Sequence, residues 1–258
     1  MPQTKIVFFD IDGTLIDMQA KKITPKMLET LHRLQDRGIK ICIATGRSPM
    51  VLPKIDGVAF DAYLTFNGSL CYDRKGVIFS NPIPHKDVVR FIQNAAALGR
   101  PVCVSTRGRL AANGTDTDLT DYFFIANEPV PVADDFDAVC AEDIYQLMLG
   151  CRPKDYPALL DGAPGAKIAA WWDRAVDVIP AGGGKGIGIE KTLAYYGLDK
   201  AEALAFGDGN NDREMLQAVG TGVAMENGSP ELKAIADEIC GPVYEDGIYH
   251  YCADKGLI

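Results

Sequence analysis

Two carboxylates one residue apart follow the first apolar run of the chain. The run covers residues 6–9, is made of β-branched and aromatic side chains, and leads into Asp10, Asp12 and Gly13. Such a run predicts a buried parallel strand, and open α/β sheets bind ligands at the carboxyl ends of such strands. Two acids this close repel each other unless a cation or a proton offsets their charge. The pair therefore favours a metal site or an acid–base site over a solvated turn.

Further polar residues stand beside other predicted strand ends and helix starts. They are Thr45 after a strand at 39–44, Lys185 before a helix, and Asp208, Asn211 and Asp212 after a strand at 203–206. Because parallel strands bring their carboxyl ends to one edge of a sheet, we expect these groups to lie near the first pair of acids. Carboxylates and a carbonyl suit a hard cation such as Mg²⁺, and lysine and hydroxyl groups can hold phosphate oxygens. A carboxylate at a strand tip could then attack phosphorus.

Three familiar binding motifs are excluded by the residues present. A glycine–lysine pair before the predicted helix resembles a P-loop, but Ile179 and Gly186 stand where a glycine and a magnesium-binding hydroxyl are needed. The acidic stretch after residue 207 resembles the start of a calcium loop, but Arg213 and Val219 stand where glycine and glutamate are needed. The glycine clusters do not form the dinucleotide-binding fingerprint either.

Strand and helix patterns alternate at both ends of the chain. Strands are predicted at 6–9, 39–44, 62–66, 203–206 and 222–225, a hairpin at 70–79, and helices at 25–37, from Ser48, at 186–196, up to 219 and from Ser229. Between them, helices at 85–98, 117–125 and 153–160 accompany strands at 102–105, 144–149, 167–172 and 175–179, and Asp173-Arg174 makes the last two strands antiparallel. We therefore predict an α/β protein whose doubly wound parallel sheet is interrupted by an inserted α+β module.

The composition limits the possible partners. The formal net charge is −9 and the pI is near 4.9, so nucleic acids and acidic membrane surfaces would be repelled. The seven cysteines are scattered and form no C-x-x-C pair, which indicates reduced thiols in a cytoplasm. No segment reaches the length of a membrane span, and no long apolar signal region begins the sequence. We expect a cytoplasmic protein with no nucleic-acid and no membrane partner.

Four motifs, in order, resemble those of the haloacid dehalogenase superfamily. They are the stretch from Asp10 to Leu15, the triplet Thr45-Gly46-Arg47, Lys185, and the stretch from Gly207 to Asp212. The resemblance covers the whole chain and is closer to the Cof-type sugar-phosphate phosphatases, whose C2-type (C2B) cap lies between the second and third motifs. It implies a Rossmann-like core at 1–81 and 181–258 and an inserted cap at 82–180 that selects the substrate. The implied activity is Mg²⁺-dependent hydrolysis of a small phosphorylated metabolite through an aspartyl-phosphate.

The resemblance also implies a role for each motif residue. Asp10 would be the nucleophile and a metal ligand, Asp12 the general acid–base with its backbone carbonyl on the metal, and Lys185 a phosphate-binding catalytic residue. The remaining residues would bind the substrate or the metal: Thr45, Gly46, Arg47, Asn67 and Asn211 the substrate and its phosphate, Asp208 and Asp212 the metal, with Asp212 acting directly or through water.

Several of these residues have purely structural alternatives. Thr45 could cap a turn, Asp212 could be a charge favoured in the first turn of a helix, Arg47 could form a surface salt bridge, and Asn211 could simply start a helix. Two alternative functions also stay open. One is a phosphomutase with the same aspartate chemistry, and the other is a non-catalytic regulator that binds a metabolite.

The strand predicted at 167–172 carries both tryptophans of the chain. Alternation along a strand would place Trp171 with Lys167 on an open face of the module, and Trp172 against the module's own helices. This makes Trp171 a candidate for substrate selection. The alternative is that both side chains pack in the core, since large aromatic residues supply buried area wherever they fall.

Overall fold

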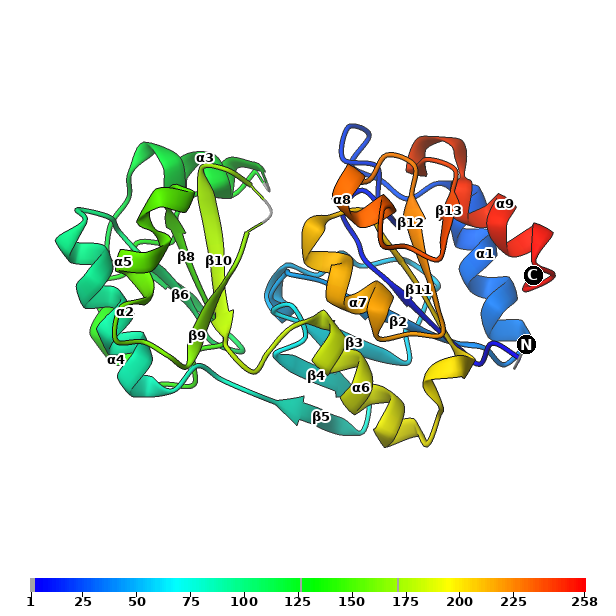
Figure 1. The fold of residues 1–258 in the computed structure, drawn as a ribbon, viewed down its shortest axis with the longest axis horizontal. Coiled ribbons are helices and arrows are strands. Elements are labelled where there is room, and N and C mark those ends of the chain that lie inside the picture. The colour runs from blue at the N-terminus through cyan, green and yellow to red at the C-terminus, as the bar shows by residue number, and fades with distance from the viewer. Residues whose placement is uncertain (1–2, 126, 171) are drawn as a thin grey trace. The chain divides into compact units, whose positions relative to one another are not determined.

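The computed structural model describes residues 3–125, 127–170 and 172–258 (Figure 1). The chain divides into two compact units. The first, called the core here, comprises the residues up to 47, 53–80 and 184–258, and the second, called the cap, comprises 48–52 and 81–183. The boundaries predicted from the sequence placed residues 48–52 in the core, whereas the structure groups this short segment with the cap.

The core is built on one eight-stranded sheet. Its strands, in spatial order, are β13 (Glu238–Cys240), β12 (Thr221–Met225), β11 (Ala203–Gly207), β1 (Ile6–Phe9), β2 (Lys40–Ala44), β3 (Ala62–Thr65), β4 (Leu70–Asp73) and β5 (Gly76–Ser80). The strands from β13 to β3 are parallel, whereas β4 and β5 form the predicted antiparallel hairpin at one edge. The central strand β1 is completely buried, as its apolar run predicts.

Helices cover both faces of this sheet. On one face α1 (Pro25–Asp36) and α9 (Gly247–Asp254) contact each other. On the other face, α6 (Lys185–Tyr196), α7 (Arg213–Gln217) and α8 (Pro230–Lys233) bury apolar side chains against alternate strand residues such as Ile6 and Phe8. This arrangement confirms the predicted doubly wound α/β core.

The start of α1 shows how local sequence sets an element. Thr24 has extended backbone angles, and its hydroxyl accepts a hydrogen bond of 3.1 Å from the backbone N–H of Met27. Pro25 then occupies the first helical turn, where its missing N–H is not needed. Met27, Leu31 and Leu34 recur at helical spacing and are buried, so capping and amphipathic pattern agree.

The cap has a five-stranded antiparallel sheet of its own. Its strand order is β7 (Leu110–Ala112), β6 (Cys103–Ser105), β8 (Gln146–Gly150), β10 (Ala175–Pro180) and β9 (Ala166–Ala169). One face packs an apolar cluster with α2 (His85–Ala97), α4 (Phe136–Val139) and α5 (Tyr156–Leu160), and α3 (Thr117–Ile125) packs against the other face. The cap is therefore the antiparallel α+β module that the sequence predicted. None of the helices in the described ranges is both long enough and apolar enough to cross a membrane.

The strand predicted at 167–172 is shorter than expected. It ends at Ala169, which pairs with Asp177. In that register Trp172 would face Arg174, leaving one residue for the turn, whereas the tightest common hairpins need about two. Trp172 is instead half-buried outside the strand, with the Arg174 guanidinium 5.1 Å from its ring centroid. The strand predicted as far as residue 172 was therefore wrong in its extent, whereas the place of Trp172 against the cap helices stays a prediction and Trp171 lies outside the described residues.

Other differences concern short elements. The helix expected after Ser48 is a single 3-10 turn over Pro49–Val51. The sequence patterns missed β7, β13 and α4, which have only three or four residues each, and also α9. Elements this short hold too few residues to show a period, so their structure depends on the sheet or helix beside them.

Candidate active site

Asp10 lies at the carboxyl end of β1, in the centre of the core sheet. Its backbone N–H donates to the carbonyl of Phe206 at 3.0 Å, which continues the ladder between β1 and β11. The residue is only 7% exposed. The parallel ladder therefore delivers this carboxylate, buried, to the edge where the strand tips meet.

Lys185 joins Asp10 to Asp212. Its Nζ lies 2.6 Å from Asp10 Oδ1 and 2.6 Å from Asp212 Oδ1, and the lysine is 1% exposed. Lys185 is the first residue of α6, and its position depends on a close backbone approach, because a Cβ on Gly68 would lie 2.5 Å from the Gly184 carbonyl oxygen. Only glycine at residue 68, where φ is +82°, permits this packing.

The loop after β11 supplies two more carboxylates. Asp212 Oδ2 accepts the backbone N–H groups of Asp208 and Gly209 at 3.0 and 2.9 Å, so with Lys185 it takes three hydrogen bonds. Asp208 Oδ1 accepts the hydroxyl of Thr14 at 3.1 Å. Carboxylate oxygens of Asp10, Asp208 and Asp212 all lie within 4.8 Å of one another. We call these three residues the acidic cluster.

The charges of the acidic cluster are not balanced by the protein. Burial raises the pKa of Asp10 well above its usual value, with Lys185 opposing and the neighbouring aspartates adding to the rise. Burial, followed by repulsion from Asp212, raises the pKa of Asp208 to about 7. Burial disfavours the ammonium of Lys185, but Asp10 and Asp212 outweigh it and raise the pKa of that group. Three carboxylates with one cation leave a charge deficit that a divalent cation would fill.

The oxygen atoms available to such a cation can be identified. Among the described residues, Asp10 Oδ2 and Asp208 Oδ2 take no hydrogen bond, whereas both oxygens of Asp212 are occupied. An oxygen-only donor set with few carboxylates and room for water fits Mg²⁺. Asp10 and Asp208 are thus suited to bind the ion directly, and Asp212 to bind it through water.

Asp12 is oriented differently from the acidic cluster. Its carboxylate accepts two hydrogen bonds from Arg47, 2.8 Å from Nε and 2.6 Å from the terminal nitrogen. The two side chains are 32% and 31% exposed, so this is a half-buried, bidentate ion pair. The pKa of Arg47 is raised by its hydrogen bonds to Asp12, with burial opposing.

The other candidate residues gather around Asn67. Thr45 is buried, and its hydroxyl accepts the backbone N–H of Arg47 at 3.1 Å, which is the turn-capping contact that its structural alternative requires. Asn211 donates to Asn67 Oδ1 at 3.2 Å, and a Cβ on Gly46 would approach the Asn67 side chain to 3.2 Å. Asn67 is 2% exposed, yet its Nδ2 donor has no partner among the described residues. A buried donor of this kind is an unfilled position for an acceptor.

Two supporting residues were not predicted. Thr14 holds Asp208, and Asn227 donates to the carbonyl of Gly13 at 2.8 Å while accepting the N–H of Val243 at 2.9 Å. No functional role was predicted for Asn227 from the sequence. The signal that could have identified it is its place just after the end of β12, because the other site residues also follow strand ends.

A family model described as haloacid dehalogenase-like hydrolase matches residues 7–252. The chain belongs to this family. The putative phosphatase YkrA of Bacillus subtilis is 34% identical over 257 residues, covering 99% of each chain. The 5-amino-6-(5-phospho-D-ribitylamino)uracil phosphatase YitU of the same bacterium is 28% identical over 262 residues, covering 95% of each.

Solved structures of haloacid dehalogenase phosphatases have the same fold. BT1666 of Bacteroides thetaiotaomicron matches with a TM-score of 0.92 and 30% identity, over 99% of this chain and 96% of that chain. The subclass IIB sugar phosphatase BT4131 matches with a TM-score of 0.89 and 28% identity, over 99% and 100%. The protein is a Cof-type phosphatase of this superfamily, and the alternative of a non-catalytic regulator is set aside.

The geometry of Gly13 yields a test of the acidic cluster. Its φ is +84°, and a Cβ there would lie 2.2 Å from Asp208 Oδ2. We expect Gly13→Ala to displace Asp208 and to lower phosphatase activity more than about tenfold, since small misplacements of reacting groups are costly. Gly38 is the matched control, because its φ is +74° but nothing lies within 4 Å of a Cβ there. Gly38→Ala should lose some thermal stability and keep its activity. Equal activity in the two variants would contradict the assignment of Asp208.

Proposed function

We propose that this phosphatase uses Mg²⁺ to hydrolyse small phosphorylated metabolites, such as sugar phosphates or similar phosphomonoesters, through an aspartyl-phosphate on Asp10. The observation that carries the proposal is the buried Lys185 between Asp10 and Asp212, beside Asp208, whose Oδ2 takes no hydrogen bond from the described residues. A structural role alone does not explain two buried and one partly buried carboxylate gathered beside one buried cation.

The metal would be held by Asp10, Asp208 and the backbone carbonyl of Asp12, with Asp212 acting through a bound water. When bound, Mg²⁺ would neutralise the charge of the phosphate oxygens and orient the phosphorus for attack. The roles of the other groups follow from the side chains around them.

Asp10 is suited to be the nucleophile. Lys185 fixes Oδ1, and Oδ2 takes no hydrogen bond from the described residues, so the carboxylate can offer one oxygen to the ion and the other to phosphorus. In the first step an Asp10 oxygen bonds to phosphorus, the bond to the ester oxygen breaks, and that oxygen takes a proton from Asp12. In the second step Asp12 takes a proton from water, the hydroxide bonds to phosphorus, and the bond to Asp10 breaks. The products are the alcohol and inorganic phosphate.

The phosphate oxygens would meet donors already present at the strand tips. Within the described ranges Asn67 Nδ2 is a buried donor without an acceptor, a state that costs about 1–3 kcal/mol and that a phosphate oxygen would relieve. Asn211 holds the Asn67 side chain in place. Thr45, the backbone of Gly46 and Lys185 would complete the set of donors.

Arg47 has a second role in this scheme. Its two hydrogen bonds fix the orientation of the Asp12 carboxylate. A protonated Asp12 cannot accept both of them, so the pair must loosen before Asp12 can protonate the leaving group. The negative charge of the incoming phosphate would attract Arg47 and loosen its pair with Asp12. Substrate binding would in this way permit the proton transfer.

The substrate class rests on the relatives and on charge. YitU is named for a phosphorylated ribityl compound and BT4131 for sugar phosphates. The net charge of −9 disfavours nucleic acids. Residues 82–180 would select among such metabolites, and the seven free, buried cysteines support a reducing, cytoplasmic location. Release of inorganic phosphate, rather than formation of an isomeric sugar phosphate, would separate this function from a phosphomutase.

Replacement of Asp10 tests the covalent step. Asp10→Asn should fold, because it keeps the shape of the side chain, but should lose nearly all phosphate release. Beryllofluoride, which mimics a bound phosphoryl group, should form an adduct on Asp10 of the unmodified protein, seen by ¹⁹F NMR. Substantial turnover by Asp10→Asn would rule out this nucleophile.

Replacement of Asp12 tests proton transfer to the leaving group. Asp12→Ala should slow hydrolysis of alkyl phosphates by about 10²–10⁴-fold, the usual contribution of a general acid. Hydrolysis of p-nitrophenyl phosphate should fall much less, because its leaving group needs no proton. Equal losses on both substrates would contradict the role of Asp12.

The raised pKa of Asp208 predicts a pH-dependent response to Mg²⁺. Without the ion, the raised pKa of about 7 keeps Asp208 protonated in the folded protein at pH values where the unfolded chain, with its usual pKa of 3.8, has already ionised. The free energy of unfolding therefore falls as the pH rises from 3.8 to about 7. Mg²⁺ binds the ionised form, so the increase in melting temperature on adding Mg²⁺ should be larger at about pH 7.5 than at about pH 5.5. Asp208→Asn is the control and should show a smaller increase with less pH dependence. An increase that is the same at both pH values would contradict the assignment.

A further inference from the structure

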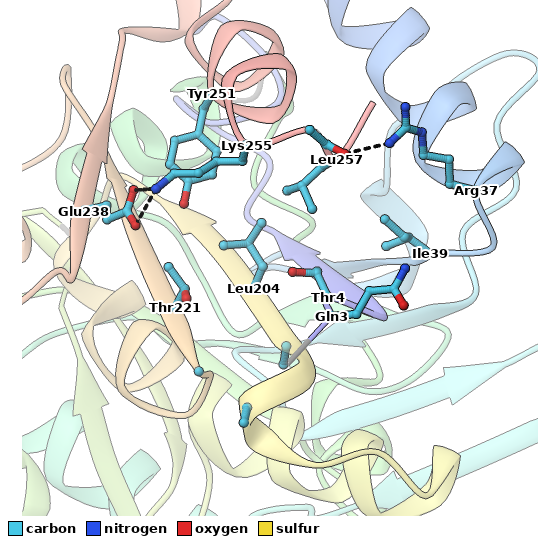
Figure 2. A pocket seen from close by; sticks show the side chains of 14 residues that line it. Gln3, Thr4, Arg37, Ile39, Leu204, Thr221, Glu238, Tyr251, Lys255 and Leu257 are labelled. Carbon is cyan, nitrogen blue, oxygen red and sulfur yellow. Dashed lines mark hydrogen bonds and ion pairs between the residues drawn. The ribbon is translucent and has the colours of Figure 1, made fainter. Parts of the chain in front are cut away.

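A pocket lies at the opposite end of the core sheet from the acidic cluster. Figure 2 shows the residues that line it. Its volume is about 430 Å³, within the range of small-molecule sites. Ile39, Leu204 and Thr221 line it at or beside the starts of β2, β11 and β12, whereas the acidic cluster follows the ends of β1 and β11. Five strand residues span about 16 Å, so the two sites are separate.

The floor of the pocket is apolar and its walls carry unpaired hydroxyls. Leu204 lies in the centre of the view, with Ile39 and Leu257 beside it. The hydroxyls of Thr4 and Thr221 form no side-chain hydrogen bond within the described ranges. Such a lining suits a compact molecule with an apolar body and polar substituents.

The charges of the lining favour an anion. Lys255 Nζ lies 2.8 and 2.7 Å from the two carboxylate oxygens of Glu238, so this pair is neutral. Arg37, on the other side of the pocket, donates one N–H to the carbonyl of Gly256 at 2.6 Å, and its other N–H groups have no acceptor in the part of the chain that the structure describes. The Arg37 guanidinium therefore gives the pocket a positive charge that pairs with no carboxylate of the described residues, although the net charge of the chain is −9.

We propose that this pocket is a binding site for a small organic anion, distinct from the catalytic site. A carboxylate or phosphate group of the ligand binds the free N–H groups of Arg37, its body lies on Leu204, and its hydroxyls meet Thr4 and Thr221. Arginine suits this task because its planar N–H groups match two oxygens of either anion.

Methyl NMR tests the proposal, with metal-free protein and two probes, 4-hydroxybenzoate for carboxylates and inorganic phosphate for phosphates. Either probe should shift the methyl signals of Ile39, Leu204 and Leu257 saturably, with a dissociation constant below about 1 mM. Ile11 and Leu15, in the loop that carries Asp10 and Asp12, report the catalytic site separately. If neither probe shifts the pocket signals, the proposal is wrong. The readout is binding, so it is independent of the proposed phosphatase chemistry.

Two matched variants identify the anion-binding group. Arg37→Gln keeps a donor for the Gly256 carbonyl but removes the charge, and should weaken binding about tenfold or more, as expected for loss of a charge-assisted hydrogen bond. Arg33→Gln is the control, because Arg33 lies on α1, one turn before Arg37, and pairs with Glu29 outside the pocket. Equal weakening by both variants would show a general charge effect and overturn the proposal. Thr221→Val provides a second variant if Arg37→Gln does not fold, and unchanged affinity in it would then count against the site.

Discussion

The candidate active site depends on the buried ammonium of Lys185 and the two carboxylates that it bridges. Removing one member of a buried charge pair leaves the other without compensation, which typically costs about 3–5 kcal/mol. Here Lys185 has two partners, on loops far apart in the sequence, so one side chain ties the end of β1 to the loop after β11. The packing of Gly68 against Gly184 serves this contact, because it sets the first turn of α6 at the strand tips.

The same interaction leaves the acidic cluster short of positive charge. Both oxygens of Asp212 accept hydrogen bonds, whereas Asp10 and Asp208 each have one oxygen that takes none from the described residues, and burial is the main cause of the raised pKa of each. A protein selected for stability alone would pair or remove these groups. Asn67, whose φ of 51° lies in the left-handed region and whose Nδ2 has no partner among the described residues, is a second local cost at the same edge of the sheet. The divalent cation and the phosphate group that we propose to bind here would relieve both costs.

The two ends of the core sheet have different chemistry. At the carboxyl ends of the strands, the excess charge is negative and largely buried. At the opposite end, the lining combines apolar side chains, hydroxyls and the Lys255–Glu238 pair with the exposed guanidinium of Arg37, which pairs with no carboxylate of the described residues. A doubly wound sheet permits this division because its strands separate two solvent-facing edges, and each edge is formed by its own set of loops and helix ends.

The order and period of the apolar residues were enough to predict the parallel core, the inserted antiparallel module and the capped start of α1. These features depend on local patterns, which the strand and helix periods impose on any buried face. The grouping of Asp10, Lys185, Asp208 and Asp212 at one edge could also be predicted from the sequence, since parallel strands align their ends.

The side-chain pairings could not be predicted from the sequence. The bond from Arg47 to Asp12, the free donor of Asn67 and the support from Thr14 and Asn227 join loops that meet only when the sheet and its helices pack. The end of β9 was likewise decided by its register with β10, because a longer strand would leave no room for a turn.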